Sequence, residues 1–386
     1  MQDIKTGPLE HNLSFLKGEE KNPKQMVDFL QTDAVFRSFA QILSQFCHGN
    51  LKEKLVDGFA DQIGESREHA ARKVRNWMNG KHMPQNRETI FQICFILSLK
   101  EQEASSVLGM LSDTGIHYRN PKELAYAYAL RMGQPYAKAR ELGKKAMDIY
   151  TSAVSKPEGA GDFDLKARNG FTRQMQECFA EVASEDELFA FVKEHGRELG
   201  RLHDTAYLKF IELLDLLQHP KGRGGEEEKA FTLDQVMEQY LRMNVPVQAR
   251  NHKNDAIGQT EGKKLTAVQK LIKKCWPNEG TLVRMRRRQE DVSRKTLILL
   301  YLATEEFDFE PEEEDAYYNM EEIEEDADLM LEIRRKRMDL FLDTYGMNLL
   351  DPGNPFDFLV FYAMRAQEDD CMQERMEKML NVLFPV

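Results

Sequence analysis

Apolar residues recur every three or four positions along most of this chain, which is the spacing of one face of a helix. Phe36, Phe39, Ile42, Leu43 and Phe46 follow it first, and the pattern then repeats through residues 51–63, 67–78, 86–97 and 100–108. No stretch alternates apolar and polar positions in the manner of a strand. We therefore predict an all-α fold, with five short helices forming one compact domain at residues 33–112.

Turn and capping residues separate these predicted helices. Gly64 suits the left-handed position that ends a helix, Ser66 suits the N-cap of the next one, and Asn86 suits the N-cap of the helix after that. Pro84 lies between the last two helices, where it prevents the earlier one from continuing. The boundaries are thus predicted from residue chemistry as well as from spacing.

Further signals divide the rest of the chain. The pair Ser184 and Glu187 predicts a capping box that opens one long helix reaching Leu217, and Thr232 and Gln235 predict another capping box. Between them, the run PKGRGG from Pro220 marks a domain boundary. We expect a multi-domain helical protein in which two modules flank a helical bundle: a polar N-terminal arm at 1–32, a helix-turn-helix domain at 33–112, a helical middle domain at 113–219, a linker at 220–230, a second basic module at 231–304, an acidic segment at 305–328 and C-terminal helices at 329–386.

Charge is distributed unevenly around a formal net charge of -12. Residues 67–87 hold six Lys or Arg and one acid, and residues 250–298 hold 13 Lys or Arg and five acids. Residues 305–328 hold 14 acids and no base. A basic face acts locally, within a Debye length of about 10 Å, so two of these segments are candidates for binding a polyanion despite the negative total.

The first basic segment contains a recognisable pattern. Val74-x-x-Trp77-x-x-Gly80-Lys81-x-x-Pro84, followed by Arg-Glu-Thr-Ile, resembles the lambda-repressor-like (XRE) helix-turn-helix family after its recognition helix. The resemblance covers about residues 33–108. It implies a recognition helix in the major groove of DNA, with base-edge contacts at Arg72, Lys73 and Asn76.

The second basic segment repeats part of this pattern. Ser293-Arg-Lys-Thr-Leu matches Asn86-Arg-Glu-Thr-Ile in cap position and polarity. With a one-residue gap in the turn, Leu282 and Met285 fall on the positions of Val74 and Trp77, so we predict that they are buried. A second helix-turn-helix-like unit is the expectation. We also expect Trp77 and Trp276 to fill cores rather than to stack on bases.

The leading functional hypothesis is a cytoplasmic regulator that binds double-stranded DNA without catalysis. In the alternative without DNA binding, the first basic face is only a solvated surface, and the second basic segment pairs with the acidic segment 305–328. If the acidic segment competed with DNA for the second basic segment, it would be autoinhibitory. The candidate DNA contacts are Arg67, Arg72, Lys73, Arg75, Asn76, Lys81, Lys273, Lys274, Arg284, Arg286, Arg287 and Arg288.

Other classes of function find little support in the sequence. The five cysteines form no CxxC pair and are expected to be buried small hydrophobes in a reducing cytosol, while His195 and His203 lack metal-site spacing. No Walker loop, GxGxxG or GxSxG is present, so neither a cofactor nor catalysis is expected. No signal peptide or membrane span is expected either. The rival hypotheses are a protein-interaction adaptor that docks another protein through its helical middle or its acidic segment, and a helical enzyme of unfamiliar type.

Overall fold

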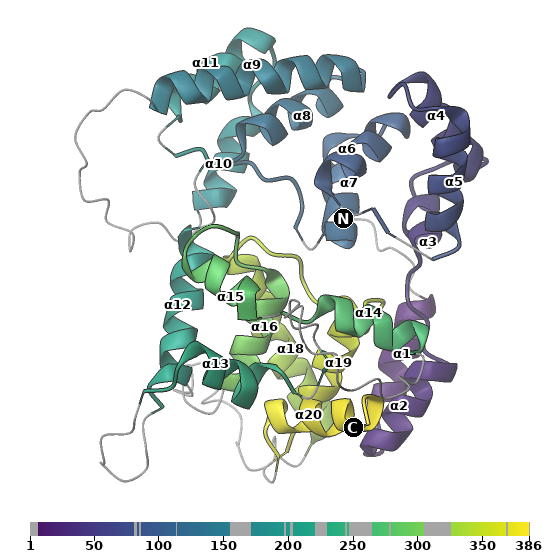
Figure 1. Cartoon of the computed structure of the whole chain (residues 1–386), viewed down its shortest axis with the longest axis vertical. Coiled ribbons are helices and arrows are strands. Elements are labelled where there is room, and N and C mark those ends of the chain that lie inside the picture. The colour runs from purple at the N-terminus through teal and green to yellow at the C-terminus, as the bar shows by residue number, and fades with distance from the viewer. Residues whose placement is uncertain are drawn as a thin grey trace, which may run out of the picture. The chain divides into compact units, whose positions relative to one another are not determined.

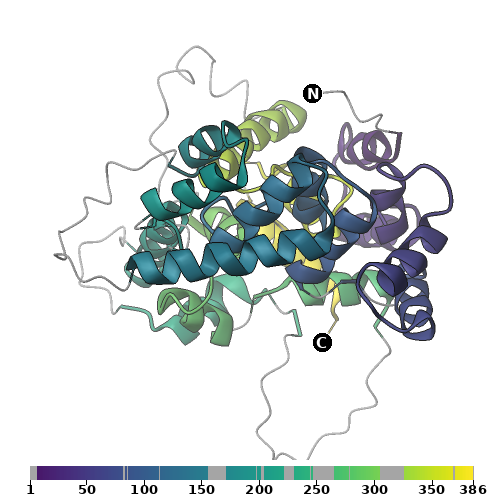
Figure 2. The same ribbon diagram turned by 90° about the horizontal axis from the view of Figure 1, so that it is seen from above.

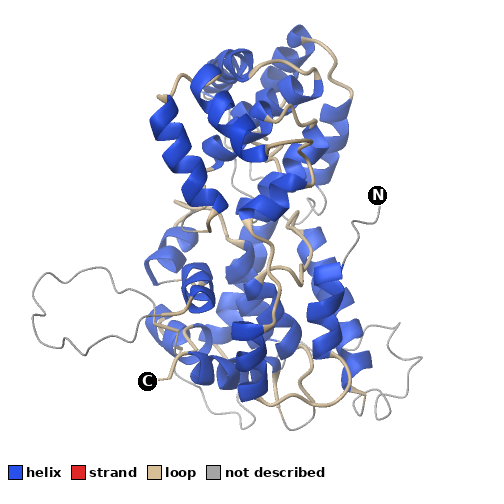
Figure 3. Ribbon diagram, turned by 90° about the vertical axis from the view of Figure 1, so that its right-hand side faces the viewer, coloured by secondary structure: helices blue, strands red, loops and turns tan. Residues whose placement is uncertain are grey.

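The structure is a computed structural model, and it describes the chain except residues 1–6, 81–82, 85, 113, 155–170, 197, 201–203, 221–229, 244, 247–264, 278, 305–325, 368–369 and 386. Within that described part all regular structure is helical and no strand occurs (Figure 3), which confirms the predicted fold class. The chain forms two compact units. Unit 1 comprises Met1–Phe36, Ala206–Phe341 and Leu349–Val386, and unit 2 comprises Arg37–Thr205 and Leu342–Asn348.

Unit 2 contains the five predicted N-terminal helices and the helices that follow them (Figure 1). In chain order they are α3 (Phe39–Ser44), α4 (Leu51–Asp61), α5 (Arg67–Met78), α6 (Arg87–Ile96), α7 (Glu101–Ser112), α8 (Pro121–Arg131), α9 (Tyr136–Val154), α10 (Phe171–Ala180) and α11 (Glu185–Glu194). The long helix α9, in blue-teal, is seen side-on in Figure 2.

A single core runs through unit 2. Phe39, Phe59 and Trp77 meet in its first half, with ring centroids 5.5 and 5.7 Å from the Trp77 ring. Tyr126 of α8 then packs edge-on against Phe91 of α6 at 5.0 Å, which joins the later helices to the same core. The sequence suggested separate domains at 33–112 and 113–219. They share one core because α8 presents the buried run LAYAYAL to α6 and α9.

Unit 1 draws its helices from both ends of the chain. They are α1 (Gly7–Leu16), α2 (Pro23–Thr32), α12 (Asp204–Gln218), α13 (Leu233–Val236), the π-helical turn η2 (Met237–Leu241), α14 (Ala267–Cys275), α15 (Glu279–Arg286), α16 (Arg294–Thr304), α18 (Ala327–Thr344), α19 (Pro355–Ala363) and α20 (Met372–Leu383). Trp276 packs edge-on against Phe356 and donates its indole N–H to the Leu241 carbonyl at 2.7 Å. Both tryptophans are 5% exposed, so their predicted core role is confirmed.

The predicted N-terminal arm is wrong in its described part, because it forms α1 and α2. Leu16, Met26 and Leu30 are buried, and α2 packs against α20 near the opposite end of the chain. The Asn12 amide is fully buried and donates to the carbonyls of Val35 and Pro352 at 2.8 and 2.9 Å. The contact of Asn12 with Pro352 and the packing of α2 on α20 join residues more than 300 positions apart, so the local pattern gave no sign of them.

The predicted long helix from Ser184 to Leu217 is also wrong. The Ser184 capping box is present, but α11 ends at Glu194 and α12 begins only at Asp204. Gly200 between them has φ +70°, a backbone conformation that ends regular helices. Most of the predicted linker 220–230 and of the acidic segment 305–328 lies outside the described residues, and so does the proposed autoinhibition.

Candidate nucleic-acid interface

Helix α5 is held in unit 2 by one face only. The Ser66 hydroxyl accepts the backbone N–H of His69 and so caps the helix, as predicted. Ala70, Val74 and Trp77 are buried against α3 and α4, with the Ala70 and Val74 side chains fully covered. The turn from α4 to α5 contains Gly64 at φ +83°, the left-handed conformation predicted for it. The remaining circumference of α5 is therefore left to solvent.

Two arginines occupy that outer face. Arg72 and Arg75 lie three residues apart, are exposed, and form no ion pair within the part of the chain that the structure describes. Asn76, one position further, is half-buried at the edge of the face. Glu68, one turn before Arg72, is exposed on the same face and is its one acidic member. The face is therefore cationic with a single opposing charge.

The other candidate residues of this segment behave differently. Lys73 donates to the Glu65 carboxylate, and its Nζ lies 3.5 Å from the centre of the Phe59 ring. Lys73 is thus engaged inside unit 2, which argues against the base contact that the resemblance implied. Arg67 pairs with Asp57 at 2.6 Å, but both side chains are largely exposed, so this pair is easily exchanged. Lys81 lies outside the described residues.

The second basic segment places its arginines around the end of α15. Leu282 and Met285 are buried, as predicted. Arg286 and Arg287 are exposed, with no ion pair among the described residues. Arg284 is not available in the same way, because its Nε donates to Glu290 at 2.6 Å and its Nη2 to the Thr281 hydroxyl at 3.1 Å.

The remaining candidates of this segment add little free charge. Arg288 has φ +54°, and its guanidinium lies 4.0 Å from the Tyr207 ring centre, a cation–π contact within unit 1. Lys273 is half-buried on α14, and the side chain of Lys274 lies outside the description. Among the candidates that the structure describes, the exposed arginines without an ion pair to another described residue are Arg72, Arg75, Arg286 and Arg287.

The acids that pair with the candidates were not identified from the sequence. Glu65 lies directly before the Ser66 cap, eight residues before Lys73, and Glu290 lies six residues after Arg284. Neither separation is the three- or four-residue spacing of a pair within one helix. Each contact depends instead on a turn that brings the acid back towards the helix. Each acid lies within eight residues of its basic partner in the sequence, but that short separation predicts a contact only when the geometry of the turn is known.

One perturbed carboxylate occurs elsewhere in unit 2. Burial acts to raise the pKa of Glu88, but hydrogen bonds from Lys122 and from the hydroxyls of Tyr136 and Tyr126 outweigh it and leave the pKa below its ordinary value. These partners come from α8 and α9, so the network ties three helices together. Searched over the described residues, the structure contains no cluster of His, Cys, Asp or Glu able to hold a metal ion.

Comparison with known proteins gives no assignment: no family model, no curated protein and no solved structure matches this chain. Among the described helices, none combines the length and the apolar character needed to cross a bilayer. The functional argument therefore depends on the geometry of the helices and on their charge.

Proposed function

We propose that this protein is a non-enzymatic, cytoplasmic DNA-binding protein, a transcriptional or mobile-element regulator that contacts double-stranded DNA chiefly through α5 and needs no cofactor. The observation that carries the proposal is the position of Arg72 and Arg75, which are exposed on the side of α5 opposite its buried stripe and form no ion pair with any described residue. A major-groove reader is a helix anchored by one face that presents donors on the other. The XRE resemblance supports the same role for this helix.

The chemistry of the outer face suits nucleic acid. An arginine fork donates two hydrogen bonds to O6 and N7 of guanine, and an asparagine amide pairs with adenine in the same groove. Arg72 and Asn76 lie four residues apart, one turn along the helix, so they are placed to reach neighbouring bases. Arg75 between them, and Arg286 and Arg287 on the other unit, supply positive charge for phosphates.

A salt titration tests the proposal. Each neutralised phosphate contributes about 0.9 to the slope of log affinity against log salt, so the three phosphate contacts from Arg75, Arg286 and Arg287 give a slope of about 2.7. Affinity for a mixed-sequence 30-base-pair duplex should then fall by roughly 40-fold between about 50 and 200 mM salt. The measurement is fluorescence anisotropy of a labelled duplex. Failure of the wild-type chain to bind any duplex at the lower salt would contradict the proposal.

A pair of matched variants assigns the binding to α5. Arg72→Ala/Arg75→Ala removes two exposed charges from the outer face and should weaken binding at the lower salt. Arg140→Ala/Lys144→Ala removes two exposed charges from α9 of the same unit and should leave binding unchanged. Equal losses in both variants would show that only the general charge of the unit matters, and that α5 has no special role.

A second candidate function has a specific observation in its favour. Arg67, Lys73 and Arg284 are paired with the protein's own carboxylates, as a helix-turn-helix-like unit retained only for packing would show. In that case the chain is an all-helical protein–protein interaction adaptor. The same titration separates the two functions, because the adaptor predicts no duplex binding at about 50 mM salt.

A further inference from the structure

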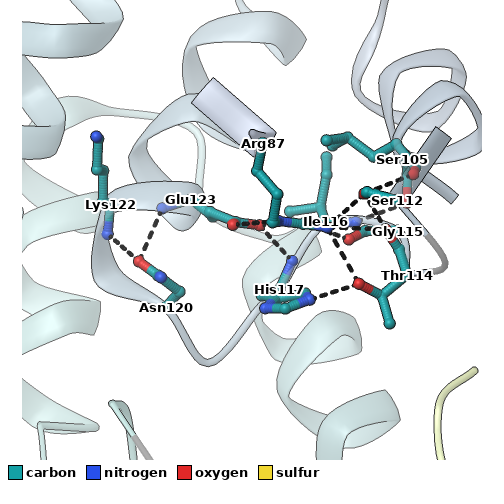
Figure 4. Close-up of polar contacts among 11 residues, drawn as sticks. Arg87, Ser105, Ser112, Thr114, Gly115, Ile116, His117, Asn120, Lys122 and Glu123 are labelled. Carbon is teal, nitrogen blue, oxygen red and sulfur yellow. Dashed lines mark hydrogen bonds and ion pairs between the residues drawn. The ribbon is translucent and has the colours of Figure 1, made fainter. Parts of the chain in front are cut away.

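The two units contain a similar arrangement of an arginine, a carboxylate and a backbone carbonyl, which is partly buried in unit 2 and fully buried in unit 1. In unit 2, Arg87, the first residue of α6, donates Nε and Nη2 to the Glu123 carboxylate at 2.8 and 2.7 Å, and Nη2 also donates to the Gly115 carbonyl at 2.6 Å (Figure 4). In unit 1, Arg294, the first residue of α16, donates to both oxygens of Asp357 at 2.8 Å. Its Nη2 also donates to the Leu349 carbonyl at 3.1 Å. We call each arrangement an arginine clamp.

The partners in the two clamps correspond residue by residue. Leu349 and Asp357 each follow their counterparts in unit 2 by 234 residues. A third contact obeys the same offset, because the backbone N–H of His117 donates to Glu123 and that of Asp351 to Asp357, both at 2.8 Å. Three contacts with one offset are hard to obtain by chance.

The helices that carry the acids also begin alike. Asn120 caps α8 and Asn354 caps α19; each side chain accepts two backbone N–H groups, and each helix has proline as its first residue. The acid is the third helical residue in both. In each unit the clamp therefore fastens the start of one helix, α6 or α16, to the start of another, α8 or α19.

The correspondence extends towards the N-terminal side of the clamps. Helix α5 precedes α6 and α15 precedes α16, and the paired positions Val74/Leu282 are fully buried. Before them, α3 and α13 each begin with a complete capping box, Ser38 with Gln41 and Thr232 with Gln235. The helices from α3 to α9 in unit 2 and from α13 to α20 in unit 1 follow in the same order, apart from additional residues in unit 1, while α1, α2 and α12 of unit 1 and α10 and α11 of unit 2 have no counterpart. The exposed arginines themselves are displaced between the two units: the positions of Arg72 and Arg75 hold Gly280 and Val283, and Arg286 and Arg287 follow about one helical turn later, at the end of α15.

We propose that the chain is a tandem of two copies of one helical unit, and that a single chain occupies two half-sites on one duplex, through α5 in one copy and through the exposed arginines at the end of α15 in the other. This inference rests on the proposed function. Helix-turn-helix proteins commonly reach two half-sites by dimerising. Here one chain supplies both helices, and covalent linkage makes binding of the second half-site intramolecular, which raises overall affinity by about 10²–10⁴ over a single site.

The experiment compares duplexes of two lengths, one of about 12 base pairs that admits one recognition helix and one of about 30 base pairs that admits two half-sites one or two turns apart. The wild-type chain should bind the long duplex at least 100-fold more tightly, at one chain per duplex in a sedimentation or mass-photometry measurement. Arg286→Ala/Arg287→Ala should bind the short duplex nearly as well as the wild type but lose most of the length preference. Arg72→Ala/Arg75→Ala should also lose it, while the α9 control variant keeps it.

The outcomes separate the tandem from the proposed function. If the wild type binds neither duplex, DNA binding itself is refuted. If it binds, but Arg286→Ala/Arg287→Ala retains the full length preference, or two chains fill the long duplex, α5 reads DNA alone and the tandem is refuted. Because all four arginines are exposed and unpaired among the described residues, the variants should fold, and unchanged thermal melting confirms it. A longer duplex also offers more overlapping positions, so the comparison between variants decides the question.

Discussion

Replacing Asp357 with asparagine should weaken unit 1 severely. The Asp357 carboxylate is 1% exposed and faces the Arg294 guanidinium, which is 3% exposed, through two hydrogen bonds of 2.8 Å. Asparagine keeps the shape and one acceptor oxygen, which can still receive the Asp351 N–H. It also turns an amide N–H towards a guanidinium that has only donors, and it leaves the arginine charge without its counter-charge in a dry site.

The expected cost follows from that burial. Removing one partner of a buried pair destabilises a protein by about 3–5 kcal/mol, because a bare charge stays in the interior. For a unit of this size, each 1 kcal/mol corresponds to roughly 2–4 °C in melting temperature, so the transition of unit 1 should fall by about 6–20 °C. The matching change in unit 2, Glu123→Gln, should cost less, because Arg87 is 24% exposed and retains carbonyl and hydroxyl partners.

The chain offers its own reporters for this experiment. It contains two tryptophans, Trp77 in unit 2 and Trp276 in unit 1, and Trp276 packs on Phe356 beside the clamp. In a Trp77→Phe background, fluorescence during urea or thermal unfolding reports unit 1 alone. In a Trp276→Phe background it reports unit 2. The Asp357→Asn change should shift the first transition strongly.

Two results would refute this reasoning. If Asp357→Asn lowered the free energy of unfolding of unit 1 by less than about 1 kcal/mol, the Arg294–Asp357 pair would contribute no more than an exposed ion pair. The clamp would then not be what holds α16 to α19. A shift confined to the Trp77 signal would place the effect in the wrong unit. As a control, the apolar pair Arg294→Met/Asp357→Leu should recover most of the lost stability, because neither charge then remains buried.

Three further outcomes are expected. In thiol labelling mapped by mass spectrometry, exposed Cys178 should react in the native protein, whereas Cys94 should react only on unfolding, because burial covers it and raises its pKa; equal rates would contradict this. Because the folded pKa of Glu88 is lowered, the stability that its carboxylate contributes should be lost as pH falls below about 4.5. Because the pKa of buried Tyr126 is raised, the protein should also lose stability as pH rises above about 10. A plot of unfolding free energy against pH should therefore have a maximum between these limits, and a flat plot would contradict both effects. Glu68→Gln should tighten duplex binding by about twofold, the effect of one unit charge at about 8 Å in water, and no change in anisotropy titrations would place α5 away from DNA.

The local chemistry of helix ends was predictable from sequence. The Ser66 cap, the Asn86 cap and the Thr232 capping box are all present where the sequence indicated them. In each case a side chain forms a hydrogen bond with the backbone two or three residues away, so both partners of the interaction can be identified from a few neighbouring residues. The burial of Leu282 and Met285 was predicted from their match to Val74 and Trp77 in the first basic segment, and the structure confirms it.

Interactions over long separations were not predictable. Residues 7–32 have modest apolar content and acquire a buried face only because α19 and α20 lie against them. The expectation that the cysteines are buried failed at Cys178, which lies on the exposed side of α10. The similarity between the two arginine clamps also escaped the sequence comparison. The additional residues between α16 and α18 displace the arginine from its acid, so no single offset aligns the whole unit.

At the candidate interface, the sequence predicted which helix carries basic residues, but it did not predict which of those side chains are exposed and which are engaged with other residues of the protein. The sequence identified a cationic helix at residues 67–78, and the structure confirms that one face of it is buried and the other exposed. It could not show that Lys73 folds back over the Phe59 ring to Glu65, while Arg72 beside it stays free of such contacts in the described chain. That difference depends on the position of α4 beside α5, which is a feature of the tertiary structure.

The most direct test of the account is the slope of log affinity against log salt for duplex binding, measured for the wild-type chain and for Arg72→Ala/Arg75→Ala. Because Arg75 is assigned to a phosphate and Arg72 to a base, the variant should bind more weakly and its slope should be smaller by about 0.9, since one fewer counterion is released. Superimposed lines would mean that neither side chain meets DNA, and α5 would then not be the surface that binds it.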